Sequence, residues 1–158
     1  MARPITELKE EGMEVGLQMV FSSYGWSGVS DGQVWDEELR LARLAADLGF
    51  DVLWSVEHHF NDYSFCPDNL QLMSYLAAEC PDVGLGTAAV ILPWHDPLRV
   101  AEDLAVLDLA SGGRMTTIAG IGYRPSEYAA HGKDWAGRGA LMDECIDTIL
   151  KAWTGEPF

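Results

Sequence analysis

The sequence predicts an α/β fold whose strands form a parallel sheet. Four short runs rich in β-branched and aromatic residues are each followed by a stretch with apolar residues at helical spacing. The expected strands begin at residues 14, 51, 83 and 114, and this repeat of about 31 to 37 residues is long enough for right-handed crossovers between parallel strands. A closed barrel of eight such units takes about 250 residues, whereas this chain has 158. We therefore expect a parallel (β/α) TIM-barrel type of fold with about four βα units, which is a half barrel.

The first two strand–helix units occupy the N-terminal half of the sequence. The first strand is expected over residues 14–21, and the helix after it over 34–48, with Leu41, Leu44, Ala45 and Leu48 on its buried face. The second helix is expected to begin near Pro67, because the first helical position does not use the N–H that proline lacks.

The next two units follow the same plan. The third strand is expected over 83–92, and Asp96-Pro97 has the residue types of an N-cap and a first helical residue. The fourth strand is expected over 114–121. A loop over 122–137 then leads to a last helix over 140–153.

Composition bears on the possible partners. The 10 lysine and arginine residues are outnumbered by 25 aspartates and glutamates, and the resulting charge of −15 repels nucleic acid and anionic membrane surfaces. No stretch approaches the roughly 20 apolar residues of a membrane span. Residues 1–13 form a polar lead-in without an apolar signal core. The length of the chain suggests one domain, which we expect over 14–158. Three cysteines without zinc-like spacing are typical of reduced, buried thiols, and we expect a cytoplasmic protein.

The residues Glu57-His58-His59-Phe60 directly follow the second expected strand. In parallel α/β proteins, reactive side chains gather at the carboxyl ends of the strands, so this cluster is a candidate active-site rim. If the extended backbone continues, Glu57 and His59 share one side and His58 takes the other. A metal-dependent barrel hydrolase that uses these three side chains is one alternative. Neighbouring ligands on a strand point apart, however, so we expect no metal site.

Three motifs follow one another along the chain. They are Glu57-His58-His59-Phe60, the segment 86–93, and Gly113-Arg114 with Gly120-Ile121-Gly122-Tyr123. In this order and spacing they resemble the bacterial luciferase-like, flavin-dependent monooxygenase family. The resemblance runs from about residue 14 to residue 158 and covers the N-terminal half of that family's barrel. It implies a (β/α)₈ barrel that binds reduced FMN, or a related deazaflavin, at the carboxyl ends of the strands. Family members activate oxygen on the flavin or transfer hydride.

The resemblance also implies roles for individual residues. His58 matches the histidine that family members use beside the flavin as a proton donor or acceptor, and imidazole exchanges protons near neutral pH. Ala88-Ala89 matches a cofactor-binding position where the peptide beneath the flavin ring is often cis without involving proline. Glu57 matches a position near the flavin ring, where its alternative role is to orient a histidine.

The expected phosphate contact departs from the family pattern. Gly120 and Gly122 match a glycine loop beside the flavin, but Ile121 stands where an arginine is common. Arg124 is the candidate replacement, because a guanidinium can meet phosphate oxygens in pairs. A surface ion pair between Arg124 and Glu127 is the alternative.

The resemblance implies a monooxygenase that uses reduced flavin and O₂ on a small apolar organic substrate. A half barrel leaves strand edges and an apolar face uncovered, so we expect activity only within a complete barrel, through a homo-oligomer or a missing second half. The chain alone is expected to bind flavin weakly. A non-catalytic half-barrel partner subunit is the alternative function. Some aromatic and methionine side chains are candidates for a substrate pocket, although core packing also explains them: Met19, Phe21, Trp26, Trp54 and Trp94.

Overall fold

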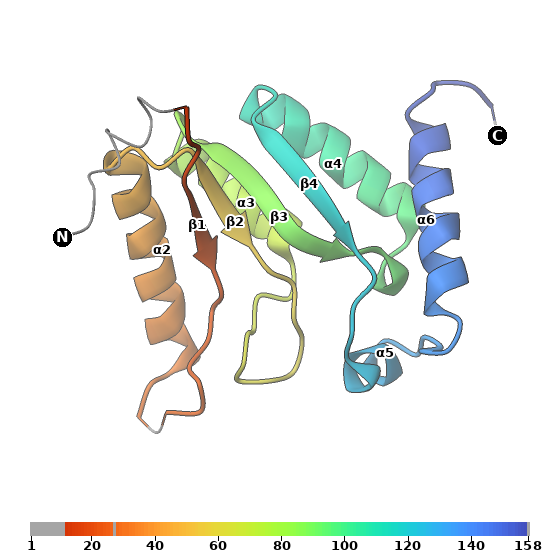
Figure 1. Cartoon of the computed structure of the whole chain (residues 1–158), viewed down its shortest axis with the longest axis horizontal. Helices are drawn as coiled ribbons and strands as arrows, with labels where there is room; N and C mark the ends of the chain where they lie inside the picture. Colours follow the sequence, from red (N-terminus) through yellow and green to blue (C-terminus); the bar gives the residue numbers. More distant parts are fainter. Residues whose placement is uncertain (1–11, 27, 158) are drawn as a thin grey trace.

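The computed structural model describes residues 12–26 and 28–157 of the chain. Four parallel strands form one sheet in the order β1-β2-β3-β4, so each strand pairs with the next one in sequence (Figure 1). This confirms the predicted α/β fold with about four βα units. Of the predicted lead-in, residues 1–11 lie outside the described residues. The strands are β1 (Gly16–Met19), β2 (Val52–Ser55), β3 (Gly84–Ile91) and β4 (Met115–Gly120).

The strands are shorter than the sequence predicts. β1 ends at Met19, and Phe21 has a left-handed backbone with φ of 53°, which an extended strand does not accommodate. β2 ends at Ser55, so the Glu-His-His cluster lies in the loop that follows the strand. The cluster is thereby free of the strict alternation of a strand.

The helices cover one side of the sheet. Figure 1 shows α3 and α4 behind the sheet, α2 beside β1, and α6 next to α4. The six-residue helix α5 lies within residues 122–137, where the sequence predicts only a loop. The helices are α2 (Asp31–Asp47), α3 (Asn69–Glu79), α4 (Pro97–Ser111), α5 (Pro125–Ala130) and α6 (Arg138–Ala152), and a 3₁₀ turn, η1 (Leu92–Trp94), follows β3.

Side-chain caps fix where the first three of these helices begin. Ser30 and Gln33 form a capping box, so α2 begins three residues earlier than predicted. Asp68 caps α3, and Pro67 therefore precedes the cap instead of opening the helix. Asp96 caps α4 as predicted.

The main core lies between the sheet and helices α2 and α3. Ala45 is buried in this core as predicted, whereas Leu44 and Leu48, also predicted to be buried, are 41% and 57% exposed. Ala42 packs in the core beside Ala45. A second core joins α4 and α6 to the end of β3.

The three cysteines are free and buried, and burial raises the pKa of Cys66 to about 11. Fully buried residues of the main core include Met19, Leu53, Leu85, Met73 and Leu76.

The opposite side of the sheet carries Trp54 between two glycines. In the strand register, Trp54 pairs with Gly86 of β3 and with Gln18 of β1, and its indole extends over Gly16 of β1. A Cβ on either glycine would come within 2.6 Å of the indole. On β4, the strand next to β3, the side chain of Ile118 is also partly open to solvent, with 47% of its surface exposed. Among the described residues, no helix is both long and apolar enough to cross a membrane.

One arginine ties several elements together at the amino end of β4. The guanidinium of Arg114 donates to the carbonyl oxygens of Ala77 at 2.9 Å and Ser111 at 2.7 Å. It also donates to those of Cys80 and Val83. These bonds join the end of α3, the turn into β3 and the end of α4.

Candidate functional site

Three segments meet at the carboxyl ends of the strands: the loop after β2, the end of β3 with η1, and α5 after β4. All strand arrows in Figure 1 point to the end of the molecule where these segments lie. The loop is held by backbone hydrogen bonds from His58 to Cys66 and from Phe65 to Phe21, both 3.1 Å long. The predicted rim residues therefore lie at the carboxyl edge of the sheet.

His58 is paired with a carboxylate that comes from α5. Its Nδ1 lies 3.1 Å from Oε1 of Glu127, whose side chain is buried. The same oxygen accepts a hydrogen bond from the backbone N–H of His59 at 2.9 Å and one from the Asn61 amide at 3.4 Å. A surface ion pair between Arg124 and Glu127, the alternative to a phosphate contact, is therefore wrong, since Glu127 is buried and faces the histidine loop.

Glu57 is the centre of a second network. Its Oε1 lies 2.6 Å from Nε2 of His95 and 3.2 Å from Nε2 of His59, and its Oε2 accepts from the backbone N–H of Ile91 at 2.7 Å. Burial by itself raises the pKa of Glu57, but the hydrogen bonds from His59 and His95 outweigh it, so the pKa lies below its ordinary value. Burial lowers the pKa of His95, and the bond to Glu57 overcomes this and holds that pKa above its ordinary value.

The Glu57 carboxylate is directed toward the helix layer. With His95 and Asp68 it lines a pocket of about 120 Å³ between α3 and α4. Both of its oxygens accept from protein donors, which matches the alternative that Glu57 orients a histidine. Contact between Glu57 and a cofactor stays a prediction.

The ring of His58 contacts two tyrosines, and both of these also contact Arg124. Tyr63 and Tyr123 contact the His58 ring edge-on, with ring centroids 5.2 and 5.6 Å away. The guanidinium of Arg124 lies 5.0 Å from the centre of the Tyr63 ring and 5.7 Å from that of Tyr123. Tyr63 and Tyr123 thus connect Arg124 to the predicted catalytic histidine.

Small residues line the end of β3 and β4. The peptide between Ala88 and Ala89 is cis, as predicted. Both residues are half-buried, and so is Gly120 on the neighbouring strand. A Cβ on Gly120 would lie 2.9 Å from that of Ala89 and 2.8 Å from Cδ1 of Ile91, so close packing requires glycine there.

His59 belongs to an aromatic cluster away from His58. Its ring lies edge-on to His131 and Trp94, with centroids 4.5 and 5.2 Å apart, and the latter two rings stack. Burial and the nearby His59 lower the pKa of His131. Nε1 of Trp94 and Nε2 of His131 are buried without a hydrogen-bond partner among the described residues.

The three adjacent side chains do not converge on one point. His58 bonds to Glu127, while His59 bonds to Glu57, although the cluster lies beyond the end of β2, where strand alternation no longer applies. The described residues contain no group of three or more histidines, cysteines, aspartates or glutamates placed to hold a metal ion.

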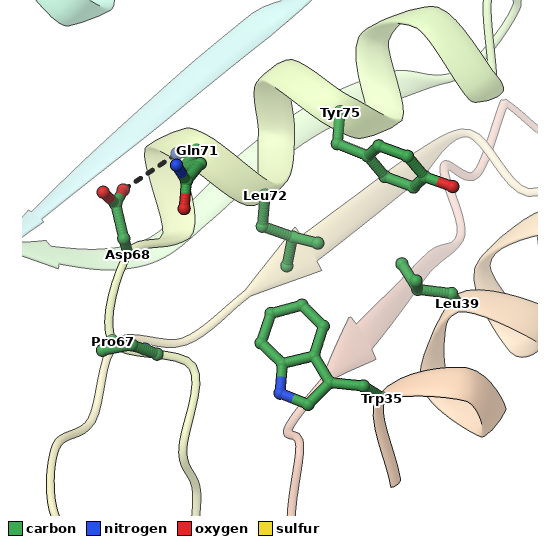
Figure 2. A pocket seen from close by; sticks show the side chains of 7 residues that line it. All are labelled: Trp35, Leu39, Pro67, Asp68, Gln71, Leu72 and Tyr75. Atoms are coloured by element: carbon green, nitrogen blue, oxygen red, sulfur yellow. Dashed lines mark hydrogen bonds between the residues drawn. The ribbon is translucent and has the colours of Figure 1, made fainter. Parts of the chain in front are cut away.

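An apolar pocket lies between α2 and α3, away from the histidine loop. Figure 2 shows Trp35 and Leu39 facing Leu72 and Tyr75 across it. Its volume is about 310 Å³, and its one carboxylate, that of Asp68, already caps α3. The pocket thus lacks a free acid or base for chemistry.

The predicted aromatic and methionine set does not form one pocket. Met19 and Phe21 are fully buried in the core, Trp26 is 70% exposed, and Trp94 packs on Tyr128. Core packing, the alternative, explains Met19 and Phe21.

Comparison with known proteins identifies the family. The family model described as luciferase-like monooxygenase matches residues 13–158. The chain belongs to the luciferase-like monooxygenase family.

Two luciferase-like relatives illustrate the match. The alkanal monooxygenase alpha chain of Photorhabdus laumondii is 30% identical over 122 residues, which are 77% of this chain and 34% of that protein. The protein y4vJ of Sinorhizobium fredii, which is uncharacterized, is 32% identical over 77% of this chain and 35% of its own length. The chain thus spans about a third of the length of these curated relatives.

Solved luciferase-like structures share the fold. Monooxygenase RslO1 from Streptomyces bottropensis superposes with a TM-score of 0.84 at 32% identity, over 92% of this chain and 44% of that one. The oxygenating constituent of 3,6-diketocamphane monooxygenase from Pseudomonas putida, in complex with FMN, gives 0.83 at 27% identity, over 92% and 41%. The four βα units correspond to less than half of either chain.

Sequence reasoning did not identify two candidate functional residues, Glu127 and His95, in this luciferase-like chain. Glu127 lies in a helix too short for apolar periodicity, although Pro125 at its first position and an acidic residue in its first turn are helix-start signals. His95 follows β3 without a motif of its own, and only the fold brings it to Glu57.

Proposed function

We propose that the chain provides the N-terminal half of a flavin-dependent monooxygenase that uses reduced FMN and O₂ on a small apolar organic substrate. Family membership supports flavin-dependent oxygenation. The FMN complex of the diketocamphane enzyme supports FMN in particular. The names of relatives that act on alkanal and limonene support an apolar substrate.

The position of His58 carries the proposal. Its Nδ1 is held by a buried carboxylate, while its Nε2 makes no hydrogen bond with any described residue. A histidine held at one nitrogen and free at the other is suited to accept and return a proton at the free atom. His58 lies at the carboxyl edge of the sheet, where parallel α/β enzymes bind their ligands.

The residues around His58 fit a flat aromatic cofactor. Ala88, Ala89 and Gly120 are small and half-buried, so a ring can approach their backbone closely. Reduced flavin, when bound, supplies the electrons that activate O₂. In this proposal Ala88, Ala89 and Gly120 border the ring, Arg124 reaches toward the phosphate, and Glu57 orients His59.

The site is complete only when the other half of a barrel faces it. Ligand pockets bury most of their ligand's surface, whereas the sheet surface that carries Trp54 and the half-exposed Ile118 is open. We therefore assign activity to a complete barrel that contains this chain.

The test uses a complete barrel in which this chain is joined to the C-terminal half of a family member. Reduced FMN is titrated without oxygen, and turnover is then measured with O₂ and two apolar probes, decanal and limonene. We expect flavin binding and product formation. His58→Gln should lower kcat by about 10²- to 10⁴-fold, as the loss of a general acid–base does, without abolishing flavin binding.

Glu102, an exposed acid that pairs with Arg99 on the surface of α4, provides a control variant away from the site. Glu102→Gln should leave turnover unchanged. A barrel that binds no reduced flavin would contradict the proposal. An active barrel whose turnover is unaffected by His58→Gln would instead identify the chain as a non-catalytic partner.

A further inference from the structure

We propose that Glu127 is the positioning residue of His58, and that it fixes His58 as the tautomer with the proton on Nδ1 and a bare Nε2. The neighbouring His59 is held in the opposite tautomer by Glu57. The use of the bare Nε2 for proton transfer rests on the proposed function. The assignment of the two tautomers is independent of that function.

The hydrogen bonds at Glu127 determine which atom carries the proton. Oε1 accepts the backbone N–H of His59 at 2.9 Å and the Asn61 amide at 3.4 Å, so it acts as an acceptor. The Nδ1 atom of His58, 3.1 Å from the same oxygen, must therefore be the donor. A neutral imidazole has one N–H, which leaves Nε2 of His58 without a proton.

His59 shows the reverse arrangement. Its Nε2 lies 3.2 Å from Oε1 of Glu57, whose lowered pKa keeps it an anionic acceptor at neutral pH. The proton of a neutral His59 is therefore on Nε2. Two histidines that are adjacent in sequence thus present different nitrogen atoms, because their carboxylate partners come from different elements.

The burial of Glu127 indicates a role beyond stabilising α5. The residue is 2% exposed, and its Oε2 is buried without a hydrogen-bond partner among the described residues. A buried carboxylate oxygen without a partner is unfavourable for stability, and such groups are often retained for function.

The segment that carries Glu127 is firmly anchored. Tyr128, the next residue, is fully buried, packs against Trp94 and Trp135, and donates from its hydroxyl to the carbonyl of Ile121. This anchoring holds the carboxylate in place against the loop after β2. Glu127 therefore acts as a rigid partner rather than a mobile surface acid.

The test is nuclear magnetic resonance of the full chain labelled with ¹⁵N-histidine, at pH 8 and without flavin or substrate. The sequence has 4 histidines, so few signals need assignment. We expect His58 as the Nδ1–H tautomer and His59 as the Nε2–H tautomer. In Glu127→Gln the Nδ1–H to Nε2–H ratio of His58 should fall roughly tenfold, the equivalent of one charge-assisted hydrogen bond, while His59 keeps its tautomer.

Two further variants complete the design. Glu127→Asp keeps a carboxylate and should retain part of the preference, and Glu102→Gln should change nothing. An unchanged ratio in Glu127→Gln would overturn the inference. If that variant does not fold, the wild-type spectrum decides, because an Nε2–H His58 would equally overturn it. The complete-barrel test can fail while these tautomers are observed, so the two proposals are distinguishable.

Discussion

The indole of Trp54 lies against the backbone of Gly86 in the neighbouring strand. A Cβ on Gly86 would be 2.3 Å from Cε3 of the indole, well inside van der Waals contact. The glycine in this strand is therefore needed for a tryptophan on the inner face of the sheet, independently of any cofactor.

Gly86→Ala should destabilise the chain by about 1–3 kcal/mol, the usual effect of overpacking. The clash is with one side chain, so in a Trp54→Ala background the same change should have almost no effect. Urea denaturation of the two single variants and the double variant measures the coupling. Strictly additive effects would show that the indole does not enforce this glycine.

Gly139 in α6 is the matched control for this substitution. Nothing lies within 4 Å of a Cβ placed there. Because alanine has the higher helix propensity, Gly139→Ala should stabilise the chain by roughly 0.5–1 kcal/mol.

The bond between Glu57 and His95 predicts a stability maximum in mildly acidic solution. The pKa of Glu57 is lowered from 4.5, so its contribution is complete above that pH and is lost as the pH falls through the folded-state value. The pKa of His95 is raised from 6.5, so its contribution is complete below that pH and is lost as the pH rises through the folded-state value. Both contributions are present together between pH 4.5 and 6.5.

Urea midpoints from pH 4 to 9 test this coupling. Glu57→Gln should cost about 3 kcal/mol near pH 6, because it breaks a buried charge pair, and should flatten both arms of the pH profile. His95→Gln should remove mainly the alkaline arm. A His95→Gln profile that keeps the wild-type alkaline arm would assign that arm to another group.

Arg114 should be important for stability. The planar guanidinium of Arg114 donates to four carbonyl oxygens, and the single ammonium group of a lysine cannot replace all four bonds. We therefore expect Arg114→Lys to lower the free energy of unfolding by roughly 2–3 kcal/mol. Among the described residues, the guanidinium of Arg99 makes surface ion pairs on α4, so Arg99→Lys should change the unfolding free energy by less than about 0.5 kcal/mol. Equal effects of the two variants in urea denaturation would contradict this account.

The chain alone should bind FMN weakly or not at all. The candidate contacts come from one side, whereas ligand sites usually enclose about 70–90% of the ligand surface. A fluorescence titration of the monomer with FMN measures this directly. Tight binding at one FMN per monomer would show that four units suffice.

Sequence reasoning predicted the repeating units, the parallel sheet and the location of the Glu-His-His cluster, because apolar periodicity and strand ends are local features. It predicted only part of the buried face of α2: Ala45 is in the core as predicted, whereas Leu44 and Leu48 are exposed and the small residue Ala42 is buried. Intrinsic hydrophobicity does not determine which face of a helix meets its neighbour.

The residues that contact the site histidines and Glu57 could not be predicted from the sequence for another reason. Glu127 and His95 lie 69 and 38 positions from the residues that they contact. Such pairs are determined by where the elements pack, and no spacing along the chain encodes them. The short helix α5 has too few turns to show a periodic pattern.

The strictly sequential order of the strands has a consequence for synthesis. Val52 pairs with Gly16, Gly84 with Val52, and Met115 with Leu85, so every strand docks onto the one translated immediately before it. A nascent chain can therefore add one strand at a time as it leaves the ribosome, and no early strand has to wait for a distant partner within this sheet.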